Sequence, residues 1–307
     1  MSFKYKKVVV FGGTGFVGSA LRVHRPAWVY LSSNDCDLTN IQSVIDTLNK
    51  IKPDAILHLA AKVGGIKENR DNQAVFFDDN VLMNTNVIKA AHMCNIERVL
   101  ASLSTCAFPD KCESYPFDES ALFSGPPAET NFSYGFSKRM LHVQCMSYRK
   151  QFGRNYSTFC PSNIYGPGDN FDLGSSHFVA ALVRKIHENS DGKVMMWGTG
   201  NPRRQQLYVE DLAKIIPSLL EKHNTSLPVI VSPNENLSIF EMCKIAANEI
   251  SPGIRFEFNL ELDGQYRKDG SNSELFRLIG DFNFTNFSIG VKKTYEWYKS
   301  STRHNNN

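Results

Sequence analysis

We predict an α/β fold, with a doubly wound parallel sheet and a smaller C-terminal lobe, from three observations. Residues 8–11 form a short, continuous apolar run that glycine stops, which is typical of a fully buried strand. The segment 12–18, with the sequence GGTGFVG, then leads into a helix. Apolar runs and helical patterns alternate from there to residue 164, and such alternation indicates parallel strands joined by crossover helices.

The elements after the first strand follow from their own local signals. The helix that begins near Gly15 has to be short, because Pro26 stops it and the apolar run 28–31 already forms the second strand. Apolar residues recur at roughly helical spacing over 80–94. The remaining elements expected before residue 165 are strands over 54–61, 98–104 and 156–164, and a helix over 133–152.

Three glycines on a period of three, Gly12, Gly15 and Gly18, lie where the first strand meets the first helix. One glycine permits the tight turn, another lets the backbone approach a pyrophosphate, and the third lets helix and strand pack closely. The helix N-terminus adds N–H groups and a positive dipole. A merely tight turn would not explain all three glycines, so the pattern predicts a dinucleotide-binding (Rossmann) domain.

Beyond residue 165 the alternation loosens, and glycine, proline and asparagine become frequent. The segment 208–213 and the helix after it are expected to return to the first domain. The predicted division gives residues 1–164 plus about 206–227 to the dinucleotide-binding domain, residues 165–205 plus 228–300 to a substrate-binding lobe, and residues 301–307 to a disordered tail.

Composition excludes several classes of function. The chain has 307 residues, of which 42% are apolar and 21% charged, and its net charge of +3 is too small to indicate a nucleic-acid partner. No apolar stretch approaches the roughly 18 residues that span a bilayer, so no membrane partner is expected. Seven cysteines without a C-x-x-C spacing indicate neither a disulfide framework nor a metal site. We expect a reducing compartment, the cytoplasm.

A Tyr-x-x-x-Lys pair, Tyr134 and Lys138, is predicted to polarise a substrate carbonyl. A four-residue step on a helix puts both side chains on one face, where the ammonium can lower the tyrosine pKa from about 10. Ser104 ends the fourth strand at the edge where open α/β sheets bind ligands, so it can hydrogen-bond the same oxygen. The spacing recurs at Tyr295 and Lys299 without a serine partner, and we interpret that copy as an exposed helix pair.

Cys106 is a candidate base. It follows Ser104 by two residues, so both side chains face the same way on an extended chain. Most unpaired cysteines are small buried hydrophobes, but a thiol of pKa about 8.5 can be tuned to remove a proton near neutral pH. His177 precedes an apolar helix that begins at Phe178, and the residues alone leave open whether it caps that helix, lies at the surface or takes part in catalysis.

The choice between NADP and NAD depends on the end of the second strand. Ser32, Ser33 or Asn34 occupies the position where a carboxylate would hold a free ribose hydroxyl. The absence of a carboxylate there permits the 2′-phosphate of NADP, which we favour. No arginine occupies that position either, and Arg22 or Arg25 is left to bind the phosphate.

Longer stretches give the chain a resemblance to a known family. They are residues 58–66, 104–109, 161–170, 197–204 and 263–265. In these stretches the chain resembles the extended short-chain dehydrogenase/reductases and, within them, the epimerase-reductases that act on GDP-4-keto-6-deoxymannose. Sugar-nucleotide dehydratases of similar pattern carry Asp-Glu after the threonine, and 4-epimerases lack the thiol, whereas Thr105 is followed here by Cys106 and Ala107.

The resemblance implies a bifunctional enzyme that performs 3,5-epimerisation and NADPH-dependent 4-reduction of GDP-4-keto-6-deoxy-D-mannose to GDP-L-fucose. In a 4-ketosugar the protons on C3 and C5 are acidic, because the C4 carbonyl can hold the resulting enolate. Cys106 is then the base and His177 the acid, while Tyr134 and Ser104 bind the C4 oxygen and Lys138 supports Tyr134. Relatives pair through two long helices of the first domain, so a homodimer is expected.

The resemblance also assigns the binding residues. NADP(H) is expected to contact Gly12, Thr14, Gly15, Phe16, Val17, Gly18, Asp37, Leu38, Leu59, Ala60, Ala61, Tyr134, Lys138, Pro161, Asn163, Ile164 and His177. The GDP-sugar is expected to contact Asn131, Asn163, Lys185, Trp197, Arg204 and Asp269, with Lys185 and Arg204 at the diphosphate and Trp197 at the nucleotide.

Three departures from the bacterial members concern the cofactor. The first helix and the loop after it are short, which bears on the adenine side. Thr14 and Asn34 replace two basic residues, and these two changes bear on the NADP preference rather than on the reaction. Two alternatives to the bifunctional enzyme stay open. One is a 4-reductase or 4-epimerase acting on a different nucleotide sugar, in which Cys106 would be inert. The other is a redox-sensing binding protein without catalysis, although such proteins usually lack the tyrosine and the lysine that this chain retains.

Overall fold

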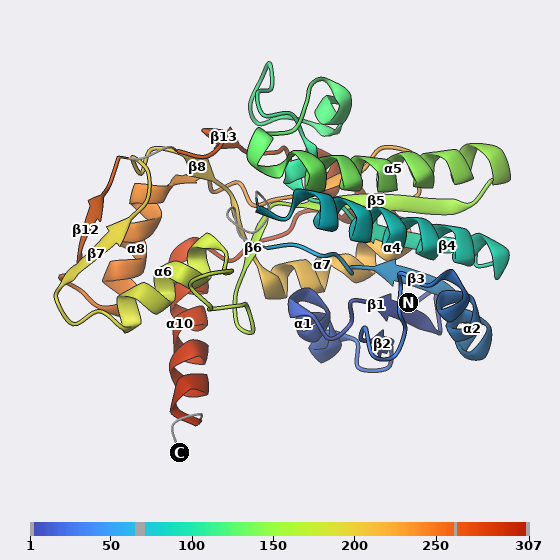
Figure 1. Cartoon of the computed structure of the whole chain (residues 1–307), viewed down its shortest axis with the longest axis horizontal. Helices are drawn as coiled ribbons and strands as arrows, with labels where there is room; N and C mark the ends of the chain where they lie inside the picture. Colours follow the sequence, from blue (N-terminus) through green and yellow to red (C-terminus); the bar gives the residue numbers. More distant parts are fainter. Residues whose placement is uncertain (1–2, 65–70, 261–262, 305–307) are drawn as a thin grey trace.

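The computed structural model describes residues 3–64, 71–260 and 263–304, and Figure 1 shows their arrangement. Within these residues the chain forms a six-stranded sheet in the order β10-β5-β4-β3-β1-β2, and every neighbouring pair is parallel. The predicted doubly wound α/β fold is confirmed. The strands are β1 (Val8–Phe11), β2 (Val29–Leu31), β3 (Ala55–His58), β4 (Arg98–Ser102), β5 (Asn155–Pro161) and β10 (Val229–Val231).

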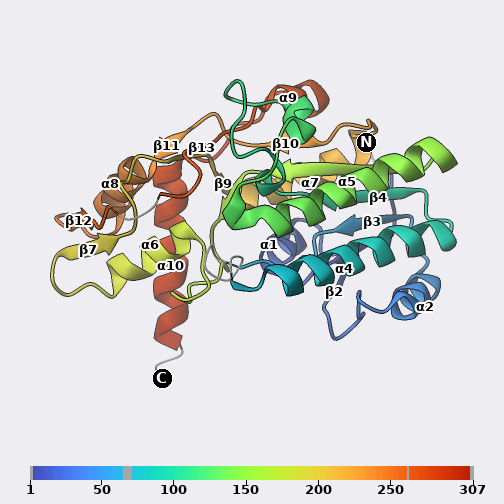
Figure 2. The same cartoon turned by 45° about the horizontal axis from the view of Figure 1, so that its top comes forward.

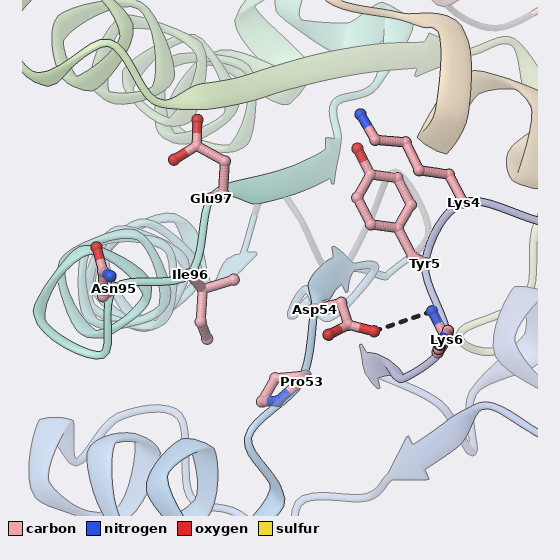
Figure 3. A pocket seen from close by; sticks show the side chains of 8 residues that line it. All are labelled: Lys4, Tyr5, Lys6, Pro53, Asp54, Asn95, Ile96 and Glu97. Atoms are coloured by element: carbon pink, nitrogen blue, oxygen red, sulfur yellow. Dashed lines mark hydrogen bonds between the residues drawn. The ribbon is translucent and has the colours of Figure 1, made fainter.

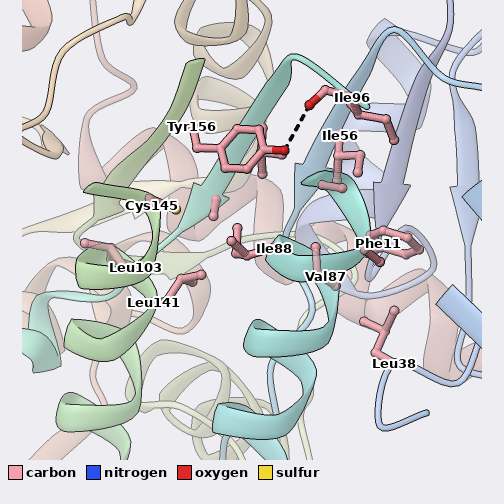
Figure 4. Packing of buried hydrophobic residues seen from close by; sticks show 14 of the residues in the cluster. Phe11, Leu38, Ile56, Val87, Ile88, Ile96, Leu103, Leu141, Cys145 and Tyr156 are labelled. Carbon is pink, nitrogen blue, oxygen red and sulfur yellow. Dashed lines mark hydrogen bonds between the residues drawn. The ribbon is translucent and has the colours of Figure 1, made fainter. Parts of the chain in front are cut away.

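Helices cover both faces of this sheet, because the strands are apolar on both sides. Val9 and Ile56 pack into a core with α2, α4 and α5, whereas their neighbours Val8 and Leu57 pack into a second core with α1, α7 and α9. Figure 4 shows the first core, where Tyr156 also donates a hydrogen bond to the Ile96 carbonyl over 2.9 Å. The helices are α1 (Phe16–His24), α2 (Ile41–Ile51), α4 (Gln73–Met93), α5 (Phe132–Phe152), α7 (Val209–Lys222) and α9 (Ser273–Ile279).

The smaller lobe has a separate core. Helices α6, α8 and α10 pack around it, and Figure 2 shows α6 and α10 nearer to the large sheet than β7 and β12. Two small sheets, β12-β7 and β11-β8-β13, complete the lobe, and β6 pairs with β9 between the lobes. The bounds are α6 (Phe178–His187), α8 (Ile239–Ile250), α10 (Phe287–His304), β6 (Asn163–Tyr165), β7 (Lys193–Met196), β8 (Arg203–Arg204), β9 (Gln206–Tyr208), β11 (Leu237–Ser238), β12 (Arg255–Phe258) and β13 (Arg267–Lys268).

The fifth predicted strand, 156–164, is two strands. β5 ends at Pro161, which has no N–H to donate to a ladder, and β6 begins at Asn163 with a different partner, β9. The prediction that residues 228–300 belong to the smaller lobe is wrong for two elements, and the prediction of a disordered tail from residue 301 is wrong for its first four residues. β10 joins the large sheet beside β5, and α9 packs on α7 and β10, so neither belongs to the smaller lobe. Residues 301–304 continue α10, while 305–307 lie outside the described residues.

Candidate active site

The glycine turn is built as the motif predicts. Gly12 has a φ of +77°, and a Cβ added to it would lie 2.7 Å from the backbone nitrogen of Ala60. A Cβ on Gly18 would lie 2.6 Å from the Gly12 carbonyl oxygen. Gly15 precedes α1 with no side chain capping the helix, so the first N–H groups of α1 are available to an anion. The backbone therefore fits a dinucleotide diphosphate.

Other predicted cofactor residues lie along the same carboxyl edge of the sheet. Leu59 continues β3 and donates its N–H to the Phe11 carbonyl over 2.9 Å, which places Leu59, Ala60 and Ala61 beside the glycine turn. Beyond β2, Asp37 accepts hydrogen bonds from the backbone and side chain of Thr39. Three more of the predicted residues lie where β5 ends and β6 begins, and these are Pro161, Asn163 and Ile164.

A carboxylate follows the three positions considered at the end of β2. Asp35 turns back and accepts hydrogen bonds from Ser32, at 2.8 Å from the backbone nitrogen and 2.6 Å from Oγ. These bonds lower the pKa of Asp35. The two candidate phosphate-binding arginines lie over aromatic rings instead, Arg22 over Tyr30 and Arg25 over Phe3.

Tyr134 and Lys138 lie on one face of α5, as predicted, and both are buried. Lys138 donates a hydrogen bond of 2.9 Å to the Ser102 carbonyl at the end of β4, and its Nζ lies 5.8 Å from the centre of the Tyr134 ring. Burial lowers the pKa of Lys138 to about 8. Burial also raises the pKa of Tyr134, the negative charge of the Cys106 and Cys160 thiols adds to the rise, and a hydrogen bond with Ser104 opposes it.

The predicted fall in the tyrosine pKa is therefore wrong. The Lys138 ammonium interacts with a carbonyl, and burial of the Tyr134 phenol outweighs any help from the cation. The neutral, protonated phenol is the form that can donate a proton. The distance from ammonium to ring does not distinguish the Tyr134–Lys138 pair from the second pair, because Lys299 also lies 5.8 Å from the ring centre of Tyr295. Burial distinguishes them, because Tyr295 and Lys299 are both partly exposed.

Ser104 and Cys106 belong to one tight turn rather than to an extended segment. A 3-10 turn covers Thr105–Ala107, and the Ser104 hydroxyl accepts a hydrogen bond of 3.2 Å from the Cys106 backbone nitrogen. The expectation that this segment is extended is wrong, because it forms a 3-10 turn. The turn nevertheless brings the hydroxyl and the thiol together, beside the buried Tyr134.

The Cys106 thiol contacts a lysine that sequence analysis missed. Lys268 Nζ lies 2.9 Å from Cys106 Sγ, and Lys268 is buried. Burial raises the pKa of the thiol, but the Lys268 charge and hydrogen bond, a hydrogen bond with Ser104 and the charge of Arg204 together lower it below its ordinary value. Lys268 lies 162 positions from Cys106, and no local pattern in the sequence pairs the two.

His177 lies at the N-cap of α6, with a φ of −74° and no hydrogen bond from its side chain to the helix. Its side chain is exposed to solvent. Desolvation by the protein atoms around the imidazole and the charge of Lys268 lower the pKa of His177. The imidazole is therefore free for a ligand, and the capping alternative is excluded by the missing bond.

The predicted substrate residues differ in availability. Trp197 is 71% exposed, and Lys185 donates to the Met195 carbonyl over 3.0 Å from α6. Arg204 lies on β8 close enough to Cys106 for their charges to interact. Asn131 ends the 3-10 turn that precedes α5. The contact of Asp269 with the GDP-sugar stays a prediction; its buried carboxylate accepts hydrogen bonds from Arg267 at both oxygens, over 2.7 and 2.8 Å.

A surface pocket lies at the opposite edge of the sheet (Figure 3). Its residues precede β1, β3 and β4, and Asp54 within it accepts a hydrogen bond of 2.9 Å from the Lys6 nitrogen. Ligands of open α/β sheets bind at the carboxyl ends of the strands, so this pocket is not the site. Among the described residues no His, Cys, Asp and Glu group could hold a metal, and no helix there is long and apolar enough to cross a membrane.

The fold and the site define an NAD(P)-binding enzyme of the short-chain dehydrogenase/reductase class. The NAD dependent epimerase/dehydratase family matches residues 8–231. A probable GDP-L-fucose synthase of Drosophila melanogaster is 35% identical, over 95% of this chain and 97% of the relative, and a GDP-L-fucose synthase of Dictyostelium discoideum is 35% identical over 95% of each.

A solved structure gives the same result. The crystal structure of a GDP-L-fucose synthetase from Naegleria fowleri bound to NADP is 29% identical, with a TM-score of 0.89 over 99% of this chain and 95% of that one. The chain therefore belongs to the NAD dependent epimerase/dehydratase family, in the group of the GDP-L-fucose synthases. The resemblance drawn from the sequence is confirmed.

Proposed function

We propose that this protein converts GDP-4-keto-6-deoxy-D-mannose to GDP-L-fucose by 3,5-epimerisation and NADPH-dependent 4-reduction. The observation that carries the proposal is a thiol of lowered pKa held in the same turn as Ser104, beside the buried Tyr134 and Lys138. A carbonyl reductase needs the serine, tyrosine and lysine but not the thiol. The thiol supplies the base that epimerisation at carbon requires.

The cofactor would be held by the glycine turn and the first N–H groups of α1, with Lys138 at its ribose and the residues after β3 and β5 beside it. NADPH, when bound, supplies the hydride for C4. The predicted contacts of Thr14, Phe16, Val17 and Leu38 belong to the same proposal. Leu38 is buried, and its carbonyl accepts a hydrogen bond from Asn86 on α4, which fixes the loop after β2.

Epimerisation would begin with the Cys106 thiolate. The thiolate takes the proton from C3 or C5, and the C–H electron pair becomes an enolate whose charge rests on the C4 oxygen. Hydrogen bonds from Tyr134 and Ser104 stabilise that oxygen. A proton returned from the opposite face inverts the carbon, and His177, exposed at the N-terminus of α6, is the proposed donor after it takes a proton from solvent.

Reduction would use the same oxygen contacts. As hydride reaches C4, the oxygen gains a proton from Tyr134, whose raised pKa keeps the phenol protonated and ready to donate. Lys138 stabilises the phenolate that remains. The GDP moiety would lie toward the smaller lobe, with its diphosphate at Arg204 and Lys185 and its base against the exposed Trp197.

Turnover in D2O tests the whole proposal. The enzyme is given GDP-4-keto-6-deoxymannose and NADPH, and the sugar product is analysed by mass spectrometry and NMR. Deuterium at both C3 and C5 of a 4-reduced product is expected. A reduced product without solvent deuterium would support the second candidate, a simple 4-reductase, and would make Cys106 inert. No reaction would refute this substrate.

We also propose that the protein is a homodimer that pairs through α4 and α5. These helices lie side by side over one face of the sheet, and their outer surfaces expose apolar side chains. The exposed set on these two helices includes Val75, Leu82, Met93, Met140 and Val143. Light scattering of the wild type and of Val143→Asp tests this, and a wild-type monomer would contradict it.

A further inference from the structure

A residue of the smaller lobe, Lys268, contacts the proposed base, Cys106. Lys268 is on β13, a strand of the small sheet β11-β8-β13, whereas Cys106 follows β4 of the large sheet. The 2.9 Å contact between Nζ and Sγ therefore crosses from the smaller lobe to the catalytic turn. β13 runs parallel to β8 with Lys268 opposite Arg204, so Lys268 contacts the thiol and the charge of Arg204 acts on it from the adjacent strand.

Each element packed around the thiol contributes to its charge balance. Lys268 and Arg204 favour the thiolate from the smaller lobe, and Ser104 hydrogen-bonds it from its own turn. Tyr134 on α5 and Cys160 on β5 are also close, and a charged Cys106 raises the pKa of both. Ser104, Tyr134 and Cys160 carry no positive charge, so among these neighbours Lys268 and Arg204 compensate the charge of the thiolate.

Carboxylates do not compete for Lys268. Within the described part of the chain, its ammonium forms no ion pair with an acid, and the nearest acid in sequence, Asp269, has both oxygens on Arg267. A buried ammonium without an anionic partner is costly, and it becomes favourable when the thiol beside it ionises. The charge of Lys268 and its hydrogen bond to Sγ therefore favour the thiolate form of Cys106.

We infer that Lys268 is the positioning residue that keeps Cys106 in its thiolate form, so that epimerisation depends on the smaller lobe being docked on the catalytic turn. This inference deepens the proposed function and rests on it. In the step concerned, the C–H bond at C3 or C5 breaks, an S–H bond forms at Cys106, and the electron pair moves to the C4 oxygen. Loss of the thiol proton to solvent restores the ammonium–thiolate pair.

The inference gives a direction for pH dependence. Replacing Lys268 by a neutral residue raises the pKa of Cys106, so less thiolate is present at neutral pH and the acidic limb of epimerisation moves to higher pH. The same change raises the pKa of His177, because the Lys268 charge lowers it. Hydride transfer uses Tyr134 and Lys138, neither of which bonds Lys268, so reduction should be affected less than proton exchange.

The first test needs no turnover. The rate at which iodoacetamide alkylates Cys106 is followed from pH 5 to pH 10 by peptide mass spectrometry on the full-length protein, for the wild type, Lys268→Met and Lys268→Arg. Lys299→Met, on α10, is the matched control. We expect a wild-type pKa below the ordinary value of about 8.5, a rise of about one unit or more in Lys268→Met, and recovery in Lys268→Arg.

A wild-type pKa at or above the ordinary value would overturn the inference without any variant, which keeps it testable if Lys268→Met does not fold. An unchanged pKa in folded Lys268→Met would also overturn it. A second measurement compares solvent exchange at C3 and C5 with hydride transfer, where a loss of exchange of up to about tenfold is expected from a one-unit shift. If the enzyme turns over no GDP-sugar, the proposed function fails while the alkylation result still decides the role of Lys268.

Discussion

The two ends of β4 each hold a buried cation, and the two cations are treated differently. Arg98 begins the strand and is fully buried, and Lys138 reaches from α5 to the carbonyl of Ser102 where the strand ends. Arg98 lies on the face that α7 covers and Lys138 on the face that α5 covers, and both are almost fully buried. The difference between them separates a cation that stabilises the fold from one that is available for chemistry.

Arg98 is surrounded by acceptors. Its Nε donates to the Leu220 carbonyl over 2.9 Å and its Nη2 to the Leu219 carbonyl over 3.1 Å, so it satisfies the last turn of α7 and meets the negative end of that helix. Nη1 adds bonds to Asn155 and to the Ser157 hydroxyl. Burial lowers its pKa to about 10, and the side chain stays charged.

Lys138 donates far fewer hydrogen bonds than Arg98. Among the described residues its ammonium makes a single hydrogen bond, to Ser102, and its pKa falls to about 8. An ammonium has three donors, so two are left for a ligand in a site from which water is largely excluded. An under-satisfied buried cation costs stability, and proteins retain such groups at functional sites. The comparison teaches that acceptor count, more than burial, marks the catalytic end of the strand.

The largest effect is expected from Lys138→Met. Loss of the ammonium should lower kcat for reduction by about 10²- to 10⁴-fold, the usual range for a lost acid–base group. Because the cation is poorly satisfied, the free energy of unfolding at pH 7 should stay at the wild-type value or rise. Stopped-flow NADPH oxidation and urea unfolding measure the two quantities. Lys299→Met, which removes a lysine at the same distance from a tyrosine, is the control and should change neither.

Arg98→Met should have the opposite signature. Removing the guanidinium leaves the carbonyls of Leu219 and Leu220 and the Ser157 hydroxyl without a donor, and about 3 kcal/mol of unfolding free energy should be lost. kcat of the folded fraction at low temperature should match the wild type. If Arg98→Met kept the wild-type stability but lost turnover, the structural role of Arg98 would be refuted.

The pH dependence of stability sharpens the same contrast. The pKa of Lys138 is about 8 in the folded protein and about 10.4 unfolded, so between these values the unfolded chain binds the proton that the folded protein has lost. Stability is lowered below pH 8 and recovers as the pH rises toward 10. From pH 8 to 9.5 the wild type should gain about 1–2 kcal/mol relative to Lys138→Met. The unfolding free energies of the two proteins are measured by urea unfolding at each pH. An equal change with pH in the wild type and in Lys138→Met would refute the lowered pKa of Lys138.

The smallest effect is expected at an exposed charge. Asp35 lies at the end of β2, where the 2′-phosphate of NADP would meet it, and solvent screens its carboxylate. Asp35→Asn should tighten NADPH about two- to fivefold while leaving NADH nearly unchanged, as fluorescence titration of the apoprotein would report. Equal changes for both cofactors would place the carboxylate away from the ribose.

Local pattern predicted much of this protein. The strands β1 to β5 and helices α1, α4 and α5 follow from short apolar runs, helical spacing and the stop at Pro26. The glycine turn was predictable because backbone clashes at Gly12 and Gly18 admit no other residue. The roles of Ser104, Tyr134 and Lys138 remain predictions, although the structure brings the three side chains to one edge of the sheet.

The sequence by itself determined the fold class, the phosphate-binding turn and the pairing of Tyr134 with Lys138, because each depends on residues within a few positions of one another. Only the tertiary structure decided that Lys268 contacts Cys106. It also decided that Asp269 accepts hydrogen bonds from Arg267 and that Asp35 accepts them from Ser32. Burial and acceptor count are properties of the folded surroundings. They separate Lys138 from Lys299 and from Arg98, and no spacing along the chain contains them.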